Sequence, residues 1–554
     1  MPLMFRFVFI KTKHFKMKNI LYLTALLFLC FTTLNFHPLT AKHPNIVWIV
    51  CEDMSPHLGC YNEKVAKTPV LDRLATEGVR YTNVFSTAGV CAPSRAALIT
   101  GCYQTAIGAQ HMRTLRITPA LKDVYPPNFK SYSAVVPTGV KCFPEYLRRA
   151  GYYCTNNPKE DYQFEAPVTA WDESSTKAHW RNRKEKSQPF FAVFNLFVTH
   201  ESQVWARDKE PLLVNPKDVE VPPYYPNDSV SRHVIARFLT NVMIMDKQVG
   251  DIIQQLKDDN LYDDTIIFFY SDHGDGMPFA KRELYDRGLK VPLIIKAPFL
   301  SKGTTDNQLI SFVDFAPSVL SLAGVPIPPS IQGQAFIGSQ KAHKSRSYIY
   351  AARDRMDSEY DRVRAVSDGR YKYLKNYMPQ LPYYQNITFR LQNPLMPHLL
   401  KLKDAGQLND TQMMWFKKSK PDEELFDTQT DLYEMNNLAN TPQYIDKLKE
   451  LRAMHLQWMK QYKDWGAIPE ADMVRQWWDG KDTAPTTAQP LVQQLKNKVK
   501  IISTTEGASI GYRRSWKDTW TVYQKPIDVQ KGDSLYVVAQ RIGYLKTEVN
   551  LVLQ

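Results

Sequence analysis

Several side chains able to bind a cation or transfer a proton follow directly on short apolar segments. They are Glu52 and Asp53 after residues 45–51, His200 after residues 190–198, and Asp272 and His273 after residues 265–270. Continuous apolar runs of this length are typical of strands buried in a parallel sheet. A single acid after a strand is often a turn residue or a helix cap. Because ligands bind at the carboxyl ends of parallel strands, three such coincidences predict a site at one sheet edge.

The carboxylates in this set indicate a cation. Glu52, Asp53 and Asp272 would repel one another and raise at least one pKa unless a positive charge lies between them. Hard carboxylate oxygens favour Ca²⁺ or Mg²⁺. His273 is a softer ligand than Ca²⁺ prefers, which leaves room for a transition metal.

The segment Cys91-Ala-Pro-Ser-Arg-Ala-Ala-Leu-Ile-Thr-Gly101 could carry a reactive group. Pro93 is tolerated in the first turn of a helix, and the following residues can continue that helix to Thr100. A side chain at position 91 would then face free amide donors and a partial positive charge, which favours a tetrahedral anion. An isolated cysteine in this position would more often be a buried structural residue.

The elements that must position these residues alternate between strands and helices. Apolar residues recur at helical spacing over residues 233–257, and residues 291–295 form a further buried-strand run. This alternation predicts an α/β sheet covered by helices on both faces. Residues 348–352 and 362–373 indicate a second, smaller sheet in an α+β subdomain. Residues 499–503, 520–523, 534–539 and 548–553 alternate like strands of a small β-sandwich.

We therefore predict five parts. They are a signal peptide (1–41), a catalytic domain (42–344), a C-terminal subdomain (345–478), a linker (479–490) and an appended β-sandwich (491–554). The sandwich could simply pack against the chain, which we favour, or bind sugars through Trp516 and Trp520.

Composition and the N-terminus constrain compartment and partners. The 26 Phe, 30 Tyr and 11 Trp exclude a disordered chain, and seven cysteines without a CxxC argue against a zinc or disulfide scaffold. Five cations and no acid lie in residues 1–41, which leaves +9 of the net charge of +14 elsewhere. With no basic run, this excess suits an anionic ligand rather than nucleic acid.

Residues 20–31 are too few to span a membrane and resemble a secretory signal. We expect export to the periplasm, the medium or, through Cys30, the surface as a lipoprotein. The mature chain should have no transmembrane span.

The segment at Cys91 resembles the sulfatase signature C-x-P-S-R-x-x-x-x-T-G, with every fixed position present. The resemblance extends over residues 44–440. It implies an alkaline-phosphatase-like fold, oxidation of Cys91 to formylglycine by a formylglycine-generating or maturase enzyme, and hydrolysis of sulfate esters or sulfamates. It also implies one Ca²⁺ (Mg²⁺ less favoured) held by Glu52, Asp53, Asp272, His273 and the modified residue 91.

The resemblance assigns catalytic roles as well. A hydroxyl of hydrated formylglycine attacks sulfur, and a second hydroxyl then loses its proton and expels sulfate. Arg95, Lys159 and Lys281 would neutralise the sulfate, and His200 or Lys281 would protonate the leaving group. Asp161 replaces a histidine of the family; it could accept the second proton or form only a salt bridge with Lys159.

The resemblance leaves open which sulfated sugar is the substrate, and two other functions are compatible with the sequence. Thr199-His200 and the short loop carrying Lys281 are most similar to the heparan N-sulfatase group, which favours a glucosamine sulfate over another O-sulfated sugar. The predicted substrate-binding residues are His111, Arg113, Arg353 and Asp354, or else these form a surface salt-bridge cluster. The alternatives are a phosphatase or phosphodiesterase of the same superfamily and a non-catalytic protein that binds sulfated glycans.

Overall fold

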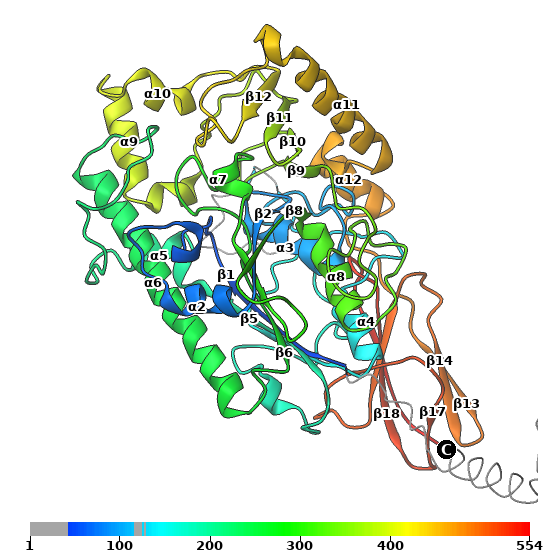
Figure 1. The fold of residues 1–554 in the computed structure, drawn as a ribbon. Coiled ribbons are helices and arrows are strands. Elements are labelled where there is room, and N and C mark those ends of the chain that lie inside the picture. Colours follow the sequence, from blue (N-terminus) through cyan, green and yellow to red (C-terminus); the bar gives the residue numbers. More distant parts are fainter. Residues whose placement is uncertain (1–42, 116–124, 127–128) are drawn as a thin grey trace, which may run out of the picture. The chain divides into compact units, whose positions relative to one another are not determined.

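An eight-stranded sheet forms the centre of the chain in the computed structural model, which describes residues 43–115, 125–126 and 129–554 (Figure 1). The predicted signal peptide and Cys30 lie outside the described residues. The strands run in the order β4-β3-β5-β1-β6-β7-β2-β8. Their bounds are β1 Asn45–Cys51, β2 Val79–Phe85, β3 Tyr153–Asn157, β4 Glu173–Ser174, β5 Phe190–Leu196, β6 Thr265–Ser271, β7 Leu293–Lys296 and β8 Thr304–Ser311.

The register of the middle strands brings the predicted site together. β1 lies parallel to both β5 and β6, with Cys51 opposite Leu196 and Ser271. The three carboxyl ends therefore lie level at one edge of the sheet. The predicted α/β sheet is confirmed.

One strand direction differs from the prediction. Residues 291–295 were expected to form a parallel strand, but β7 is antiparallel to both β6 and β2. An apolar run shows that a strand is buried on both faces and says nothing of its direction. The chain after β6 contains only the single turn α7 (Asp286–Leu289) and returns to the neighbouring position without the helical crossover that a parallel pair requires.

Helices cover both faces of this sheet (Figure 1). On one face, β1 side chains such as Val47 and Ile49 pack with α2 (Pro69–Glu77) and α6 (Ser229–Asp258). On the other, Ile46 and Trp48 pack with α3, α4 and α8. The bounds of these three helices are Cys91–Thr100, Pro144–Arg149 and Phe315–Leu322. The long helix α6 confirms the helical period predicted for residues 233–257.

A second sheet of four antiparallel strands follows in the order β12-β11-β10-β9. The strand predicted over residues 362–373 is in fact two, because the chain turns back at Asp368 and pairs with itself. Around this sheet lie α9 (Leu395–Asp404), α11 (Ile445–Gln461) and α12 (Glu470–Trp477). The four strands are β9 Ile349–Arg353, β10 Val363–Ser367, β11 Tyr371–Asn376 and β12 Glu423–Asp427.

The C-terminal strands form the expected two small sheets around a core that includes Val499, Ile501 and Val537. Lys141 donates a hydrogen bond to Ser509 Oγ (2.9 Å), so this module packs against the segment before α4. Its strands are β13 Leu491–Leu495, β14 Lys498–Ile502, β15 Ser509–Arg513, β16 Thr521–Val522, β17 Ile527–Asp528, β18 Ser534–Gln540 and β19 Thr547–Val552. Residues 44–554 form one compact unit, and the predicted boundaries within it stay an interpretation. No helix in the described part of the chain is long and apolar enough to cross a membrane.

We expect Trp48→Ala to lower the free energy of unfolding by about 3–5 kcal/mol, because the indole fills the core beneath the site. Trp48 is 3% exposed and packs against Phe143, Phe191, Tyr270 and Phe315. Urea denaturation followed by circular dichroism measures the change. Trp516→Ala is the control, since this tryptophan is 66% exposed. Equal losses in the two variants would contradict the assignment of Trp48 to the core.

Candidate active site

Cys91 is the first residue of α3 and lies buried at the carboxyl edge of the sheet. Its Sγ is 3.3 Å from His273 Nε2, 3.6 Å from Asp53 Oδ1 and 3.7 Å from Lys281 Nζ. Burial raises the pKa of the Cys91 thiol, despite the nearby lysines Lys159 and Lys281. An unmodified Cys91 is therefore a neutral thiol and a weak nucleophile.

The predicted cation-binding residues meet around this sulfur. Ligand atoms of Asp53, Cys91, Asp272 and His273 all lie within 4.8 Å of one another, and so do those of Glu52, Asp53, Cys91 and His200. Two oxygen donors and an imidazole in so small a buried volume suit a divalent cation. The donor set therefore fits the predicted metal, and its identity stays a prediction.

The two oxygens of Asp53 have different partners. Oδ2 accepts hydrogen bonds from Lys281 Nζ (2.6 Å) and from the backbone N–H of Glu201 (2.6 Å). Oδ1 lies 2.9 Å from His273 Nε2 and faces Cys91. The backbone of Asp53 is left-handed, with φ at 55°, a conformation that costs free energy in most residues and persists where its surroundings fix it. Asp53 is thus held in place with one oxygen directed at the centre of the site.

The predicted repulsion among the carboxylates contributes to a raised pKa at Glu52. Burial raises its pKa, and Asp272 and Asp53 add to that increase against the opposing effects of Lys159 and Arg95. Asp53 behaves oppositely: although burial alone would raise its pKa, Lys281 and His273 hold it well below the usual range. The pKa of Asp272 is also lowered, because His273 and Arg95 outweigh burial.

Arg95 lies four residues after Cys91 and hence on the same face of α3. Its Nε donates to Asp272 Oδ2 (3.0 Å) and its Nη1 to Asn195 Oδ1 (2.7 Å). Nη2 is buried and has no hydrogen-bond partner among the described residues. Lys159 donates to Glu52 Oε2 at 2.5 Å. Arg95 Nη2, which lies 3.9 Å from Glu52 Oε1, is thus a buried donor without a hydrogen bond at the centre of the site.

Four acids and four cations face one another at this edge, and all except Lys159, which is 20% exposed, are buried. The four acids are Glu52, Asp53, Glu201 and Asp272, and the four cations opposite them are Arg95, Lys159, Lys281 and Arg282. A divalent cation added to this set would leave a net positive charge. Such a site is complementary to a sulfate group.

His200 is oriented by its neighbours. The backbone N–H of Ser202 donates to its Nδ1 (3.2 Å), so the proton of the neutral ring is on Nε2. The exposed ring of Phe197 stacks on the imidazole at 4.7 Å between centroids. Burial, with Lys281 adding to it, lowers the pKa of His200 to about 3. The ring is therefore neutral near pH 7.

The remaining predicted catalytic residue, Asp161, stands further out. Its side chain is 36% exposed and lies 4.0 Å from Lys159 Nζ, a separation that matches the salt-bridge alternative. Its role in proton transfer stays a prediction.

The predicted substrate-binding residues lie in internal contacts. His111 is buried and accepts from the Arg355 backbone N–H (3.3 Å), and Arg113 Nε donates to Asp357 (2.5 Å). Arg353 pairs with Glu283 (2.7 Å) and Asp354 with Arg364 (2.9 Å). The salt-bridge alternative for Arg353 and Asp354 is thus realised in the interior, where both are buried, and not at the surface. Contact of any of the four with substrate stays a prediction.

Three residues of the site were missed. Glu201 binds Arg282 through both oxygens (2.8 and 3.0 Å) and lies 3.0 Å from Lys281 Nζ. Asn195 binds Arg95, as described above. Glu201 and Arg282 directly follow predicted site residues, which is the signal that could have identified them; Asn195 lies within an apolar run and gave none.

Comparison with known proteins decides the family. The Sulfatase family model matches residues 44–157 and 153–325. An ulvan-active sulfatase of Formosa agariphila is 44% identical over 544 residues, covering 91% of this chain and 90% of that protein. The chain belongs to the sulfatase family. It is a sulfuric ester hydrolase by family, which confirms the resemblance seen at Cys91 over the phosphatase and phosphodiesterase alternatives.

More distant sulfatases share the fold and part of the sequence. A family model described as N-sulphoglucosamine sulphohydrolase, C-terminal, matches residues 274–393. Human N-sulphoglucosamine sulphohydrolase is 24% identical over 485 residues, 78% of this chain and 93% of that protein. A solved structure of a 2-O GAG sulfatase aligns with a TM-score of 0.57 at 18% identity, covering 77% of this chain and 94% of that one.

We expect Glu201→Gln to lower the free energy of unfolding by about 3–5 kcal/mol, because it leaves buried Arg282 without its carboxylate. Glu210→Gln is the matched control: Glu210 pairs with Arg207 at the surface, and its loss should cost at most about 1 kcal/mol. Urea denaturation of both sulfatase variants tests this. A Glu201→Gln variant as stable as Glu210→Gln would show that the pair does not stabilise the site.

Proposed function

We propose that this sulfatase hydrolyses sulfate esters of an ulvan-type sulfated polysaccharide, using formylglycine made from Cys91. The observation that carries the proposal is the position of Cys91, at the first turn of α3 with Asp53, His273 and Lys281 around its sulfur. The substrate class rests on the 44% identity to an ulvan-active sulfatase over nearly the full length.

The chemistry requires more than the thiol provides. As a neutral buried group, Cys91 would be a poor nucleophile, whereas its oxidised and hydrated form supplies two hydroxyl groups at the same position. A separate maturation enzyme must provide the oxidant for that conversion. A bound divalent cation, for which Ca²⁺ is our choice, would orient the sulfate and polarise an S–O bond.

Side chains of this protein would neutralise the sulfate and transfer the protons. One hydroxyl of residue 91 loses its proton to a neighbouring carboxylate such as Asp53, its oxygen bonds to sulfur, and the ester S–O bond breaks. Arg95, Lys159 and Lys281 offset the charge of the sulfate oxygens in this step. The departing sugar oxygen takes a proton from Lys281 or from His200. The His200 route requires the imidazolium form, because the neutral ring holds its one N–H proton too tightly to act as an acid. In the second half, one hydroxyl of residue 91 gives up its proton, to Asp161 or to water. Sulfate then leaves with the C–O bond electrons and the aldehyde re-forms.

A glucosamine sulfate of heparan is the second candidate. It is favoured by the match of residues 274–393 to the N-sulphoglucosamine sulphohydrolase C-terminal model. We rank it second because the human enzyme of that name is only 24% identical. An extracellular polysaccharide substrate agrees with the export predicted from residues 1–41, which we retain as part of the proposal.

We expect Cys91→Ala to reduce sulfate release from ulvan by at least about 10³-fold, as removal of a nucleophile does in other hydrolases. Cys102→Ala is the matched control, because Cys102 is also buried and lies just beyond the other end of α3. Ion chromatography of released sulfate gives the rates, and mass spectrometry of the peptide containing residue 91 shows the conversion. Comparable turnover by a folded Cys91→Ala variant would refute the mechanism. Activity on N-sulfated glucosamine but not on ulvan would favour the second candidate.

We expect Asp53→Asn and Asp272→Asn each to weaken divalent-cation binding by at least about 100-fold, since loss of outer-shell groups alone costs 10–100-fold. Calcium titration followed by thermal unfolding measures the affinity independently of turnover. Asp246→Asn is the control: this carboxylate caps α2 at Val70 and Leu71, away from the cation-binding residues. Elemental analysis that finds no divalent ion in active protein would exclude the metal site.

A further inference from the structure

A pocket of about 280 Å³ lies between Pro126, residues 129–132, Tyr360 and the end of α12. Aromatic rings form much of its lining, namely Phe129, Tyr132, Tyr360 and Trp478. Three cations, Lys130, Arg475 and Lys481, and two acids, Glu470 and Asp482, line the same pocket. None of these residues belongs to the site at Cys91.

We propose that this pocket binds an uncleaved, anionic sugar unit of the same polysaccharide chain whose sulfate ester is cut at Cys91. The inference rests on the proposed function and extends it, because it assigns a second subsite to the substrate. We call the pocket the distal subsite.

The chemistry of the lining fits such a sugar. Aromatic rings present flat apolar surfaces on which a sugar ring can pack. Arginine and lysine recognise sulfate and carboxylate groups. Lys130 pairs with Asp482 (2.7 Å) and Arg475 with Asp472 (2.9 Å). The side chains of Lys130 and Arg475 are 66% and 67% exposed, and such exposed ion pairs contribute little free energy, so an anion can compete for both cations. Rings together with cations suit a charged carbohydrate better than an apolar ligand.

Hydrogen bonds within the protein hold the aromatic side chains of the distal subsite in place before a ligand binds. The buried carboxylate of Glu470 accepts hydrogen bonds from Tyr132 OH (2.7 Å), Tyr360 OH (2.7 Å) and Arg355 Nε (2.6 Å). The guanidinium of Arg355 also lies over the Phe129 ring at 4.8 Å. A site whose rings are already held in place loses little conformational entropy on binding.

The distal subsite is linked directly to the loop that carries Lys159 and Asp161. Gln163, two residues after Asp161, accepts a hydrogen bond at its carbonyl oxygen from the Ala134 backbone N–H (2.9 Å). Tyr132 is two residues before Ala134, so its backbone lies at most about 20 Å from that of Asp161. A few sugar units of one chain span that distance.

The residues between the two sites include His111 and Arg113, both expected to bind substrate. His111 holds the Arg355 backbone, and the side chains of Arg113 and Arg355 both bind Asp357. His111 therefore acts on the distal subsite through Arg355, as a positioning residue.

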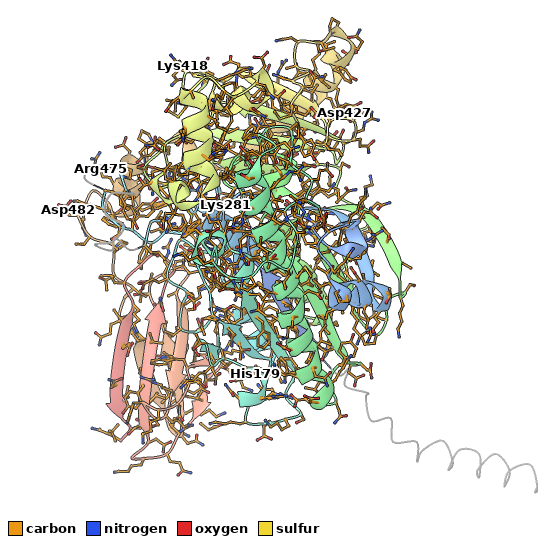
Figure 2. All side chains as sticks on the ribbon, turned by 90° about the vertical axis from the view of Figure 1, so that its left-hand side faces the viewer. His179, Lys281, Lys418, Asp427, Arg475 and Asp482 are labelled. Atoms are coloured by element: carbon orange, nitrogen blue, oxygen red, sulfur yellow. The ribbon has the colours of Figure 1, made fainter. Side chains whose placement is uncertain are left out.

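Figure 2 shows Arg475 and Asp482 together at the edge of the molecule, with Lys281 further in and Lys418 in a different region.

The first test reverses the accessible charge. We expect Arg475→Glu combined with Lys481→Glu to raise KM for ulvan roughly tenfold, with kcat within twofold. KM for the small ester p-nitrophenyl sulfate should be unchanged, because it cannot reach the distal subsite. Lys418→Glu is the matched control, an exposed lysine in another region.

The second test separates ring stacking from the hydrogen bond to Glu470. Binding to ulvan and to heparin is measured by affinity electrophoresis in a Cys91→Ala background, so that no turnover occurs. Tyr360→Phe keeps the ring and should bind like the parent, whereas Tyr360→Ala should bind roughly tenfold more weakly.

The outcomes are distinct. Unchanged KM for ulvan in the double variant, or an equal loss on p-nitrophenyl sulfate, overturns the distal subsite. Equal weakening of binding to duplex DNA also overturns it, since the surface would then attract any polyanion. Failure of the wild-type protein to hydrolyse ulvan would instead refute the proposed function. In that case the distal subsite is tested by binding of the Cys91→Ala variants to heparin. Weaker binding by Tyr360→Ala than by Tyr360→Phe would support it, and equal binding would overturn it.

Discussion

Four carboxylates buried at one sheet edge are the constraint on which the rest of this structure depends. Such a cluster is unstable unless opposite charges lie beside it, and three neighbouring segments supply them. α3 contributes Arg95, the loop after β3 contributes Lys159, and the loop after β6 contributes Lys281 and Arg282. Because these segments are far apart in the sequence, the charges can meet only when the central sheet is formed. The site and the fold are therefore stabilised together.

The parallel alignment of β1, β5 and β6 gives this cluster its geometry. Level strand ends place Asp53 beside Asp272 and His273, and the first turn of α3 adds Cys91 from the side. The helix supplies amide donors at the point where an anion is to be bound. The centre of this sulfatase site thus arises from short segments that follow regular elements, whereas Lys159, Lys281 and Arg282 come from the longer loops after β3 and β6.

Much of this could be predicted from the sequence, for reasons that particular residues make clear. The run over residues 45–51 and the pattern over residues 233–257 are local signals, and both elements formed at those positions. The direction of β7 and the split of residues 362–373 depend on how the chain returns, which hydropathy does not encode. Arg353 could not be distinguished from a surface residue, because its partners Glu283 and Gln385 are distant in the sequence. Likewise, nothing in its apolar run marked Asn195 as a ligand of Arg95.

The divided hydrogen bonding of Asp53 has a consequence for how a cation would be held. Lys281 and the Glu201 backbone fix Oδ2, which leaves Oδ1 facing Cys91 and His273. A cation at the centre of the site would therefore meet a carboxylate oxygen whose direction is set by the protein and does not depend on the cation itself.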